Sequence, residues 1–195
     1  GGVVGGNSIF VATGMGGHVT VIDRDIRRLA EIDSHYKSLI TTRFSNQTNI
    51  EEEVANADLV IGAVLVPGAE APKLVTTEMV KNMKRGSVIV DVAIDQGGCC
   101  ETSHPTTHED PTYVVNEVVH YCVANMPGAV ARTSTFALNN ATLPFALKIA
   151  ELGVKDALLS DEHLLAGLNI HAGKLTYEAV ATAQGRDFVD AANAL

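Results

Sequence analysis

The chain has 195 residues, which is long enough for one domain or slightly more with a full hydrophobic core. Hydrophobic residues make up 46% and charged residues 19%, proportions typical of a globular chain, and no apolar run reaches the roughly 20 residues of a membrane span. The net charge of -9 argues against nucleic acid and anionic membrane surfaces as partners.

The first five residues, Gly1 to Gly5, fit the later part of the G-x-G-x-x-G dinucleotide-binding pattern. Gly2 falls at the third position, where the backbone approaches a pyrophosphate, and Gly5 falls at the sixth, where the helix packs on the sheet. The first glycine of the pattern and the strand that feeds it would precede Gly1, so we expect an N-terminally truncated domain. A glycine-rich turn or a cloning remnant is the alternative explanation.

Residues Val19–Asp23 form a β-branched run that predicts a short strand ending on a carboxylate. In dinucleotide-binding folds, an acidic residue at this place accepts hydrogen bonds from the adenosine ribose. The charge of Asp23 would repel a 2′-phosphate and so favours NAD over NADP, although Arg24 weakens this preference.

Strand-like and helix-like segments alternate over the first two-thirds of the chain. Helices are expected over residues 24–39, 49–55 and 76–83, the last capped by Thr76, and further strands over 39–44, 58–65, 87–93 and 118–123. Continuous apolar runs at 58–65 and 87–93 are typical of strands buried on both faces of a parallel sheet. The pattern predicts an α/β fold with a doubly wound parallel sheet of the Rossmann type. Because its first strand is missing and is normally central, we expect a gap in the sheet.

After residue 128 the alternation ends, and helices are expected over residues 136–152, 156–168 and 175–183. Pro144 lies inside the first of these segments and should kink it or mark a helix start. These helices do not continue the strand alternation, so we expect them to belong to a second domain.

Turn-forming residues follow three of the predicted strands, at positions 64–68, 95–98 and 124–128. Ligands of open parallel sheets bind beyond the carboxyl ends of the strands. Each segment alone could be an ordinary turn, but three such ends together with Asp23 favour a shared cofactor cleft. Asp95 is the best catalytic candidate there, with a turn or N-cap role as its alternative. As a general base it would need burial to raise its pKa.

Residues 96–111 form a long segment without a helical pattern, and it holds Cys99, Cys100, His104 and His108. Loops of this length in compact domains are usually functional. No paired ligand motif is present, and Pro105 breaks the helix that could align the two histidines, so we expect no metal site. With Cys122, the cysteines form no even disulfide set, which favours packing roles and a cytoplasmic location.

Several segments closely resemble the alanine dehydrogenase family, which is related to the transhydrogenase α subunit. They are DLVIGAVLVPGAEAPKLVTTEMV, SVIVDVAIDQGGC, HPTTHEDPTYVV, VVHYCVANMPGAVARTSTFALNNATLP and GLNIHAGKLTYEAV. The resemblance runs from Gly1 to about Ala181. It implies reversible, NAD-dependent oxidative deamination of L-alanine to pyruvate and ammonium by an enzyme that is usually a hexamer. It also implies an NAD-binding domain over residues 1–131 and the C-terminal helical part of a split substrate domain over 132–195.

The resemblance also implies site residues. Asp95 matches the family's active-site aspartate. The implied cofactor contacts are Gly2, Val3, Val4, Asp23, Arg28, Ser45, Val64, Leu65, Val92, Ala93, Ile94, Asp95, Val123, Ala124, Asn125 and Met126. The family's catalytic histidine and its substrate-binding arginine and lysine precede the glycine pattern, so we expect this chain alone to be inactive. A non-catalytic NAD(H)-binding module or a transhydrogenase-like domain is the alternative function.

Overall fold

The computed structural model describes all residues, 1–195, and the chain divides into two compact units. The N-terminal unit comprises residues 1–65 and 70–126, and the C-terminal unit comprises residues 66–69 and 127–195. None of the helices combines the length and the apolar character that a membrane crossing requires.

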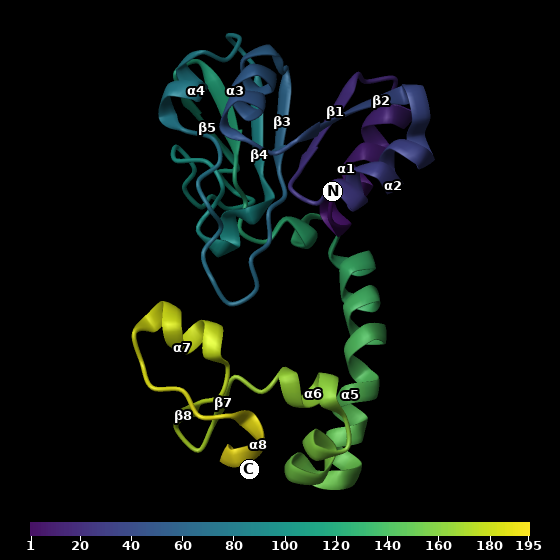
Figure 1. Ribbon diagram of the computed structural model, residues 1–195, viewed down its shortest axis with the longest axis vertical. Helices are drawn as coiled ribbons and strands as arrows, with labels where there is room; N and C mark the ends of the chain where they lie inside the picture. Colours follow the sequence, from purple (N-terminus) through teal and green to yellow (C-terminus); the bar gives the residue numbers. More distant parts are fainter. The chain divides into compact units, whose positions relative to one another are not determined.

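The N-terminal unit alternates helices and strands, as the sequence predicts (Figure 1). Asp25, Asn46 and Thr76 cap α2, α3 and α4 with side-chain oxygens, which confirms the predicted Thr76 cap. Predicted and observed ends differ by a few residues. The elements are α1 (Val3–Gly14), β1 (Val19–Asp23), α2 (Ile26–Tyr36), η1 (Lys37–Leu39), β2 (Ile40–Phe44), α3 (Gln47–Asn56), β3 (Leu59–Gly62), α4 (Thr77–Lys81), β4 (Val88–Asp91), η2 (Val92–Gln96), β5 (Thr112–Val115) and β6 (Val118–Tyr121).

The strands of this unit form two sheets, a parallel pair β1-β2 and a four-stranded sheet in the order β3-β4-β6-β5. The predicted parallel α/β architecture is confirmed for β3, β4 and β6, but β5 pairs with β6 in the antiparallel sense. The sequence does not predict this hairpin, because its turn residues, Asn116 and Glu117, adopt positive φ angles of 51° and 62° without a glycine.

No strand joins β1 to β3, so the predicted gap in the sheet is confirmed. Strand β3 therefore pairs only with β4, and the side chains of Leu59 and Ile61 are 51% and 37% exposed. The prediction that this strand is buried on both faces is wrong, because Leu59 and Ile61 are exposed beside an edge that has no neighbouring strand.

Two hydrophobic clusters lie on the two faces of the β1-β2 pair. On one face, Val21 packs with residues of α1 and α2, which lie together on that side (Figure 1). The next residue, Ile22, points to the opposite face and packs against a larger cluster that includes Ile50 and Val54 of α3. Helices thus cover both faces, as a doubly wound fold requires.

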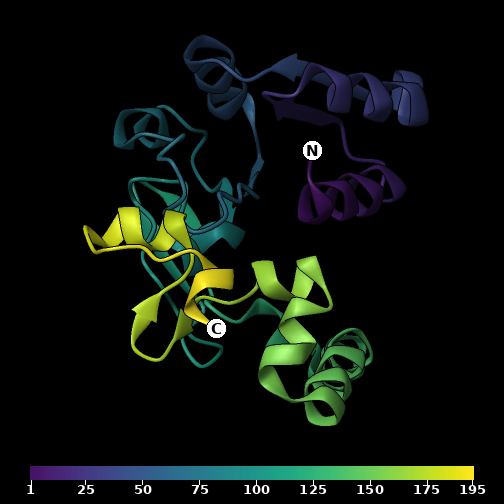
Figure 2. The same ribbon diagram turned by 60° about the horizontal axis from the view of Figure 1, so that its bottom comes forward.

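The C-terminal unit contains α5 (Ala131–Leu159), α6 (Glu162–Ala166), the hairpin β7 (Ile170–His171) with β8 (Lys174–Leu175), α7 (Glu178–Gln184) and α8 (Ala191–Ala194), preceded by η3 (Met126–Val130) (Figure 2). Pro144 was expected to kink this helix or to mark a helix start, and the helix start is wrong, because helical backbone runs continuously from Ala131 past Pro144. The break comes at Gly153, where φ is 77° and ψ is 166°. The small hairpin was not predicted, because its strands have only two residues each.

Ile89 provides a test of this packing, because its side chain is fully buried in β4, within the larger cluster. We expect Ile89→Ala to lower the free energy of unfolding by about 2–5 kcal/mol, through lost burial and a cavity. Val114 in β5 is 64% exposed, and Val114→Ala should change it by less than about 0.5 kcal/mol. Urea unfolding measures the free energy of unfolding of both variants. An equal loss in Ile89→Ala and Val114→Ala would contradict this view of the core.

Candidate functional site

Helix α1 begins at the glycine turn, and its first backbone N–H groups are free. Its N-cap, Gly2, provides no side-chain cap, and the first helical hydrogen bond runs from Gly6 N–H to Gly2 O over 2.8 Å. The N–H groups of Val3, Val4 and Gly5 therefore have no acceptor within the helix. A Cβ on Gly2 would meet no atom within 4 Å, so the space beside the turn is open. This is the arrangement in which helix N-termini bind phosphate.

Two predicted site residues, Asp23 and Arg28, contact this turn, and a third, Ser45, is bound to Asp23. Asp23 Oδ2 lies 2.8 Å from the Gly1 nitrogen, and Arg28 Nε donates to Gly1 O over 2.6 Å. Ser45 N–H donates to the backbone oxygen of Asp23 over 2.8 Å. Burial alone would raise the pKa of Asp23, but hydrogen bonds from backbone N–H groups, foremost that of Asp25, hold it below its ordinary value. Asp23 is therefore an ionised acceptor beside the glycine turn.

The remaining predicted residues follow the carboxyl ends of β3, β4 and β6. Gly62 is in register with Asp91, and Val90 with Tyr121, so the three parallel strands end at the same edge. Segments leaving this edge contain Val64, Leu65, Val92, Ala93, Ile94, Asp95, Val123, Ala124, Asn125 and Met126. The side chains of Ala93, Ile94 and Val123 are buried, so those residues can offer a ligand only their backbone. Asp95 lies in η2 and is exposed.

The long segment after η2 contains no helix, as expected, but its histidines have separate roles. His108 Nε2 lies 2.6 Å from the backbone oxygen of Asn125. The His104 ring stacks on Tyr113 with centroids 3.7 Å apart. The Tyr113 hydroxyl accepts the His104 N–H and donates to Thr102 O. The segment is thus fastened to β5 and to the end of β6.

His120 is fully buried in β6 behind this segment. Its Nδ1 lies 3.0 Å from Val118 O and its Nε2 lies 2.8 Å from Thr102 Oγ1. Because a carbonyl can only accept, we assign the ring proton to Nδ1 and an acceptor role to Nε2. Burial lowers the pKa of His120, so the folded chain favours the neutral ring.

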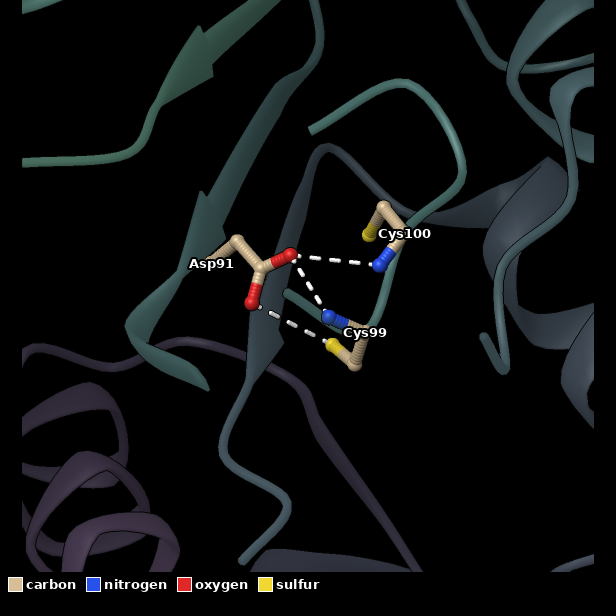
Figure 3. Close-up of side chains that lie close together, drawn as sticks. All are labelled: Asp91, Cys99 and Cys100. Carbon is tan, nitrogen blue, oxygen red and sulfur yellow. Dashed lines mark hydrogen bonds between the residues drawn. The ribbon is translucent and has the colours of Figure 1, made fainter. Parts of the chain in front are cut away.

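Asp91 is completely buried at the end of β4 and is not among the site residues predicted from the sequence. Its Oδ2 accepts the N–H groups of Cys99 and Cys100 over 2.9 and 3.2 Å, and its Oδ1 lies 3.4 Å from the Cys99 thiol (Figure 3). Both cysteines are free and buried, as the packing interpretation predicts. The signal that could have found Asp91 is a single carboxylate within the apolar run SVIVDVA.

Residues 1–178 match the family described as "Alanine dehydrogenase/PNT, C-terminal domain". The chain is 61% identical to an alanine dehydrogenase of Halomonas elongata over 193 residues, covering 99% of the chain and 52% of that relative. It is 57% identical to an alanine dehydrogenase of Bacillus subtilis over 196 residues, covering 100% of the chain and 52% of that relative. The chain spans about half the length of the curated relatives it matches.

Two solved structures are similar to the chain. A structure titled L-alanine dehydrogenase superposes with a TM-score of 0.84 at 50% identity, over 94% of this chain and 51% of that one. A transhydrogenase from Sinorhizobium meliloti superposes with a TM-score of 0.70 at 26% identity, over 91% of this chain and 48% of that one.

The buried His120 makes stability depend on pH. In the unfolded chain the pKa of His120 is near 6.5, and in the folded chain it is lower. Below about pH 6.5 the unfolded chain therefore binds a proton at this ring more readily than the folded chain does. Stability should therefore fall as the pH drops through this value, by at most about 1.4 kcal/mol per pH unit for one proton.

His120→Asn keeps a donor for Val118 O but does not titrate, so we expect urea unfolding between pH 7.5 and 5.5 to show a shallower slope for this variant. His163→Asn, at an 86% exposed side chain, should leave the slope unchanged. Equal slopes for the wild type and His120→Asn would contradict the assignment.

Proposed function

Because the chain belongs to the alanine dehydrogenase/PNT C-terminal domain family, we propose that it forms the NAD-binding part of an alanine dehydrogenase. The whole enzyme converts L-alanine, NAD and water reversibly to pyruvate, ammonium and NADH. One structural observation carries the proposal: Asp95 and the other residues after β3, β4 and β6 leave the same sheet edge. Ligands of open parallel sheets bind at such an edge.

The glycine turn fits the cofactor. The free N–H groups at the start of α1 match a pyrophosphate, and the open space beside Gly2 admits it. The ionised Asp23 can accept hydrogen bonds from both ribose hydroxyls, with Arg28 nearby and Ser45 toward the adenine. When bound, NAD supplies the hydride acceptor, and the chain's contribution is orientation and electrostatics.

The second group of residues would hold the reacting end of the cofactor. The residues that would line the reacting end of the cofactor are Val64 and Leu65 after β3, Val92 to Asp95 after β4, and Val123 to Met126 after β6. The exposed carboxylate of Asp95 can accept a hydrogen bond from the amino group of alanine. It can also stabilise the positive charge that develops on the substrate nitrogen as the hydride leaves.

We assign residues 1–131 to the NAD-binding domain and 132–195 to the C-terminal part of the substrate domain. Exposed apolar side chains on α5, including Phe136, Leu138 and Leu147, support contact with other subunits in a hexamer. The three free cysteines support a cytoplasmic location.

The similarity to a transhydrogenase supports a second candidate, a non-catalytic NAD(H)-binding module that couples the nucleotide to a partner domain. Alanine oxidation by the full-length polypeptide that contains this chain separates the two candidates. Pyruvate formation supports the dehydrogenase, whereas NAD binding without pyruvate formation supports the module.

Asp23 should control cofactor binding. We expect the full-length polypeptide to bind NAD more tightly than NADP in a calorimetric titration. Asp23→Ala should weaken NAD binding by about 10-fold or more, because hydrogen bonds to a charged group are worth about 1.5–3 kcal/mol. Asp33→Ala, on an exposed position of α2, should leave the affinity unchanged. Equal affinities of the two variants would contradict the role of Asp23.

Asp95 should control turnover. We expect Asp95→Asn to lower kcat for alanine oxidation by about 100-fold or more, since it removes charge stabilisation at the reacting centre. The KM for NAD should change little, because Asp23 and the glycine turn bind the other end of the cofactor. Asp110→Asn, in the exposed part of the long segment, is the matched control. A kcat of Asp95→Asn near that of the control would overturn the assignment.

A further inference from the structure

The loop after η2 is held by two groups of opposite charge. The Lys73 ammonium donates to the carbonyl oxygens of Gly97 and Gly98, the latter over 2.8 Å. On the other side, the Asp91 carboxylate accepts the N–H groups of Cys99 and Cys100 (Figure 3). Lys73 therefore binds two carbonyls of this loop, and Asp91 binds two of its amides and the Cys99 thiol.

The peptide group between Gly98 and Cys99 makes both contacts. Its carbonyl faces the Lys73 ammonium, and its N–H faces the Asp91 carboxylate. Hydrogen bonds in which one partner is ionised are roughly twice as strong as neutral ones. Each charge also polarises this peptide in the direction that strengthens the other bond. The orientation of this single peptide thus depends on both side chains.

The backbone of the loop is shaped for these contacts. Gly97 and Gly98 have φ angles of 89° and 76°, which side-chain-bearing residues rarely adopt. A Cβ on Gly98 would lie 2.9 Å from Asp91 Oδ2, and one on Gly62 would lie 2.3 Å from Cys99 Sγ. The carboxylate, the thiol and the end of β3 can approach one another only because both positions are glycine.

Gly97 and Gly98 also close the turn that carries Asp95. Gly97 N–H donates to Ile94 O over 3.1 Å, and Gly98 N–H donates to Ala93 O over 2.9 Å. Asp91 is the residue directly before η2, so its backbone leads into the start of this turn. Its side chain binds the amides of Cys99 and Cys100, which follow the end of the turn. Asp95 is exposed, so the backbone of η2 sets where its carboxylate lies.

We propose that Lys73 and Asp91 are positioning residues that clamp the Gly98–Cys99 peptide and so hold Asp95 in its catalytic place. This rests on the proposed function, because it assigns the catalytic carboxylate to Asp95. Neither side chain contacts substrate or cofactor in this role. A misplacement of about 1 Å at a reacting group can cost about 100-fold in rate, so a clamp outside the site can control turnover.

A metal ion is the competing use of Asp91, Cys99 and Cys100, whose ligand atoms all lie within 4.8 Å of one another. Both Asp91 oxygens already accept hydrogen bonds, one of them from the Cys99 thiol. The neighbouring Cys100, burial and the Asp91 charge raise the pKa of Cys99, which opposes the thiolate that a metal needs. The donor set therefore favours a hydrogen-bonded support.

The test compares Asp91→Ala, Asp91→Asn, Lys73→Met and the double variant Asp91→Ala/Lys73→Met in the full-length polypeptide. We expect kcat for alanine oxidation to fall about 100-fold in Asp91→Ala and about 10-fold in Lys73→Met, with the KM for NAD within about 3-fold. The double variant should lose less than the product of these factors, because both residues hold one peptide. Lys81→Met, at an exposed lysine of α4, is the control.

Asp91→Asn should recover activity to within about 5-fold of the wild type. A single oxygen, Oδ2, accepts both backbone N–H groups, and the amide oxygen of asparagine can replace it. The clamp would be overturned if the kcat of Asp91→Asn fell as far as that of Asp91→Ala. It would also be overturned if the loss in the double variant equalled the product of the two single losses. Lys73 is exposed, so Lys73→Met keeps the test decisive even if Asp91→Ala fails to fold.

Hydrogen exchange separates the clamp from the proposed function. In Lys73→Met, the amides of Cys99 and Cys100 should exchange at least about 10-fold faster, while the Ile89 amide in β4 is unchanged. Unchanged protection at the cysteines would overturn the clamp, whatever the activity. If the wild-type enzyme forms no pyruvate while the Lys73→Met variant still shows this faster exchange, the proposed function is overturned and the clamp is supported.

Discussion

Parallel pairing of β3, β4 and β6 is the interaction on which the candidate site depends. In-register pairing, with Gly62 opposite Asp91 and Val90 opposite Tyr121, makes the three strands end at one edge. Buried side chains such as Ile89 and Val118 hold these strands in place. Residues far apart in the sequence, among them Asp95 and Asn125, thereby leave the same edge of the sheet.

Three aspartates near strand ends illustrate how environment assigns different roles to one residue type. Asp23, at the end of β1, is partly exposed beside the free N–H groups of α1 and can accept ligand hydroxyls. Asp91, at the end of β4, is completely buried and uses both oxygens within the protein. Asp95, four residues later, is exposed and free to meet a substrate. In our account the buried carboxylate positions the exposed one.

Periodicity and turn residues were sufficient to predict the alternating elements of the N-terminal unit, since their apolar faces match the clusters around Ile32 and Ile50. The β5-β6 hairpin could not be predicted, because Asn116 and Glu117 adopt positive φ angles that their residue types rarely signal. Burial at Leu59 depends on a neighbouring strand rather than on local sequence. The roles of Asp91 and Lys73 could not be predicted from the sequence, because they arise from contacts between segments that are distant in the sequence.

The most direct test of the account is a crystal structure of the full-length polypeptide with NAD bound. The account predicts the adenosine ribose on Asp23, the pyrophosphate at the start of α1 and the nicotinamide at the sheet edge beside Asp95. Asp91 should still accept the amides of Cys99 and Cys100 in that complex. A nucleotide bound elsewhere, with Asp23 and Asp95 both without ligand contacts, would contradict it.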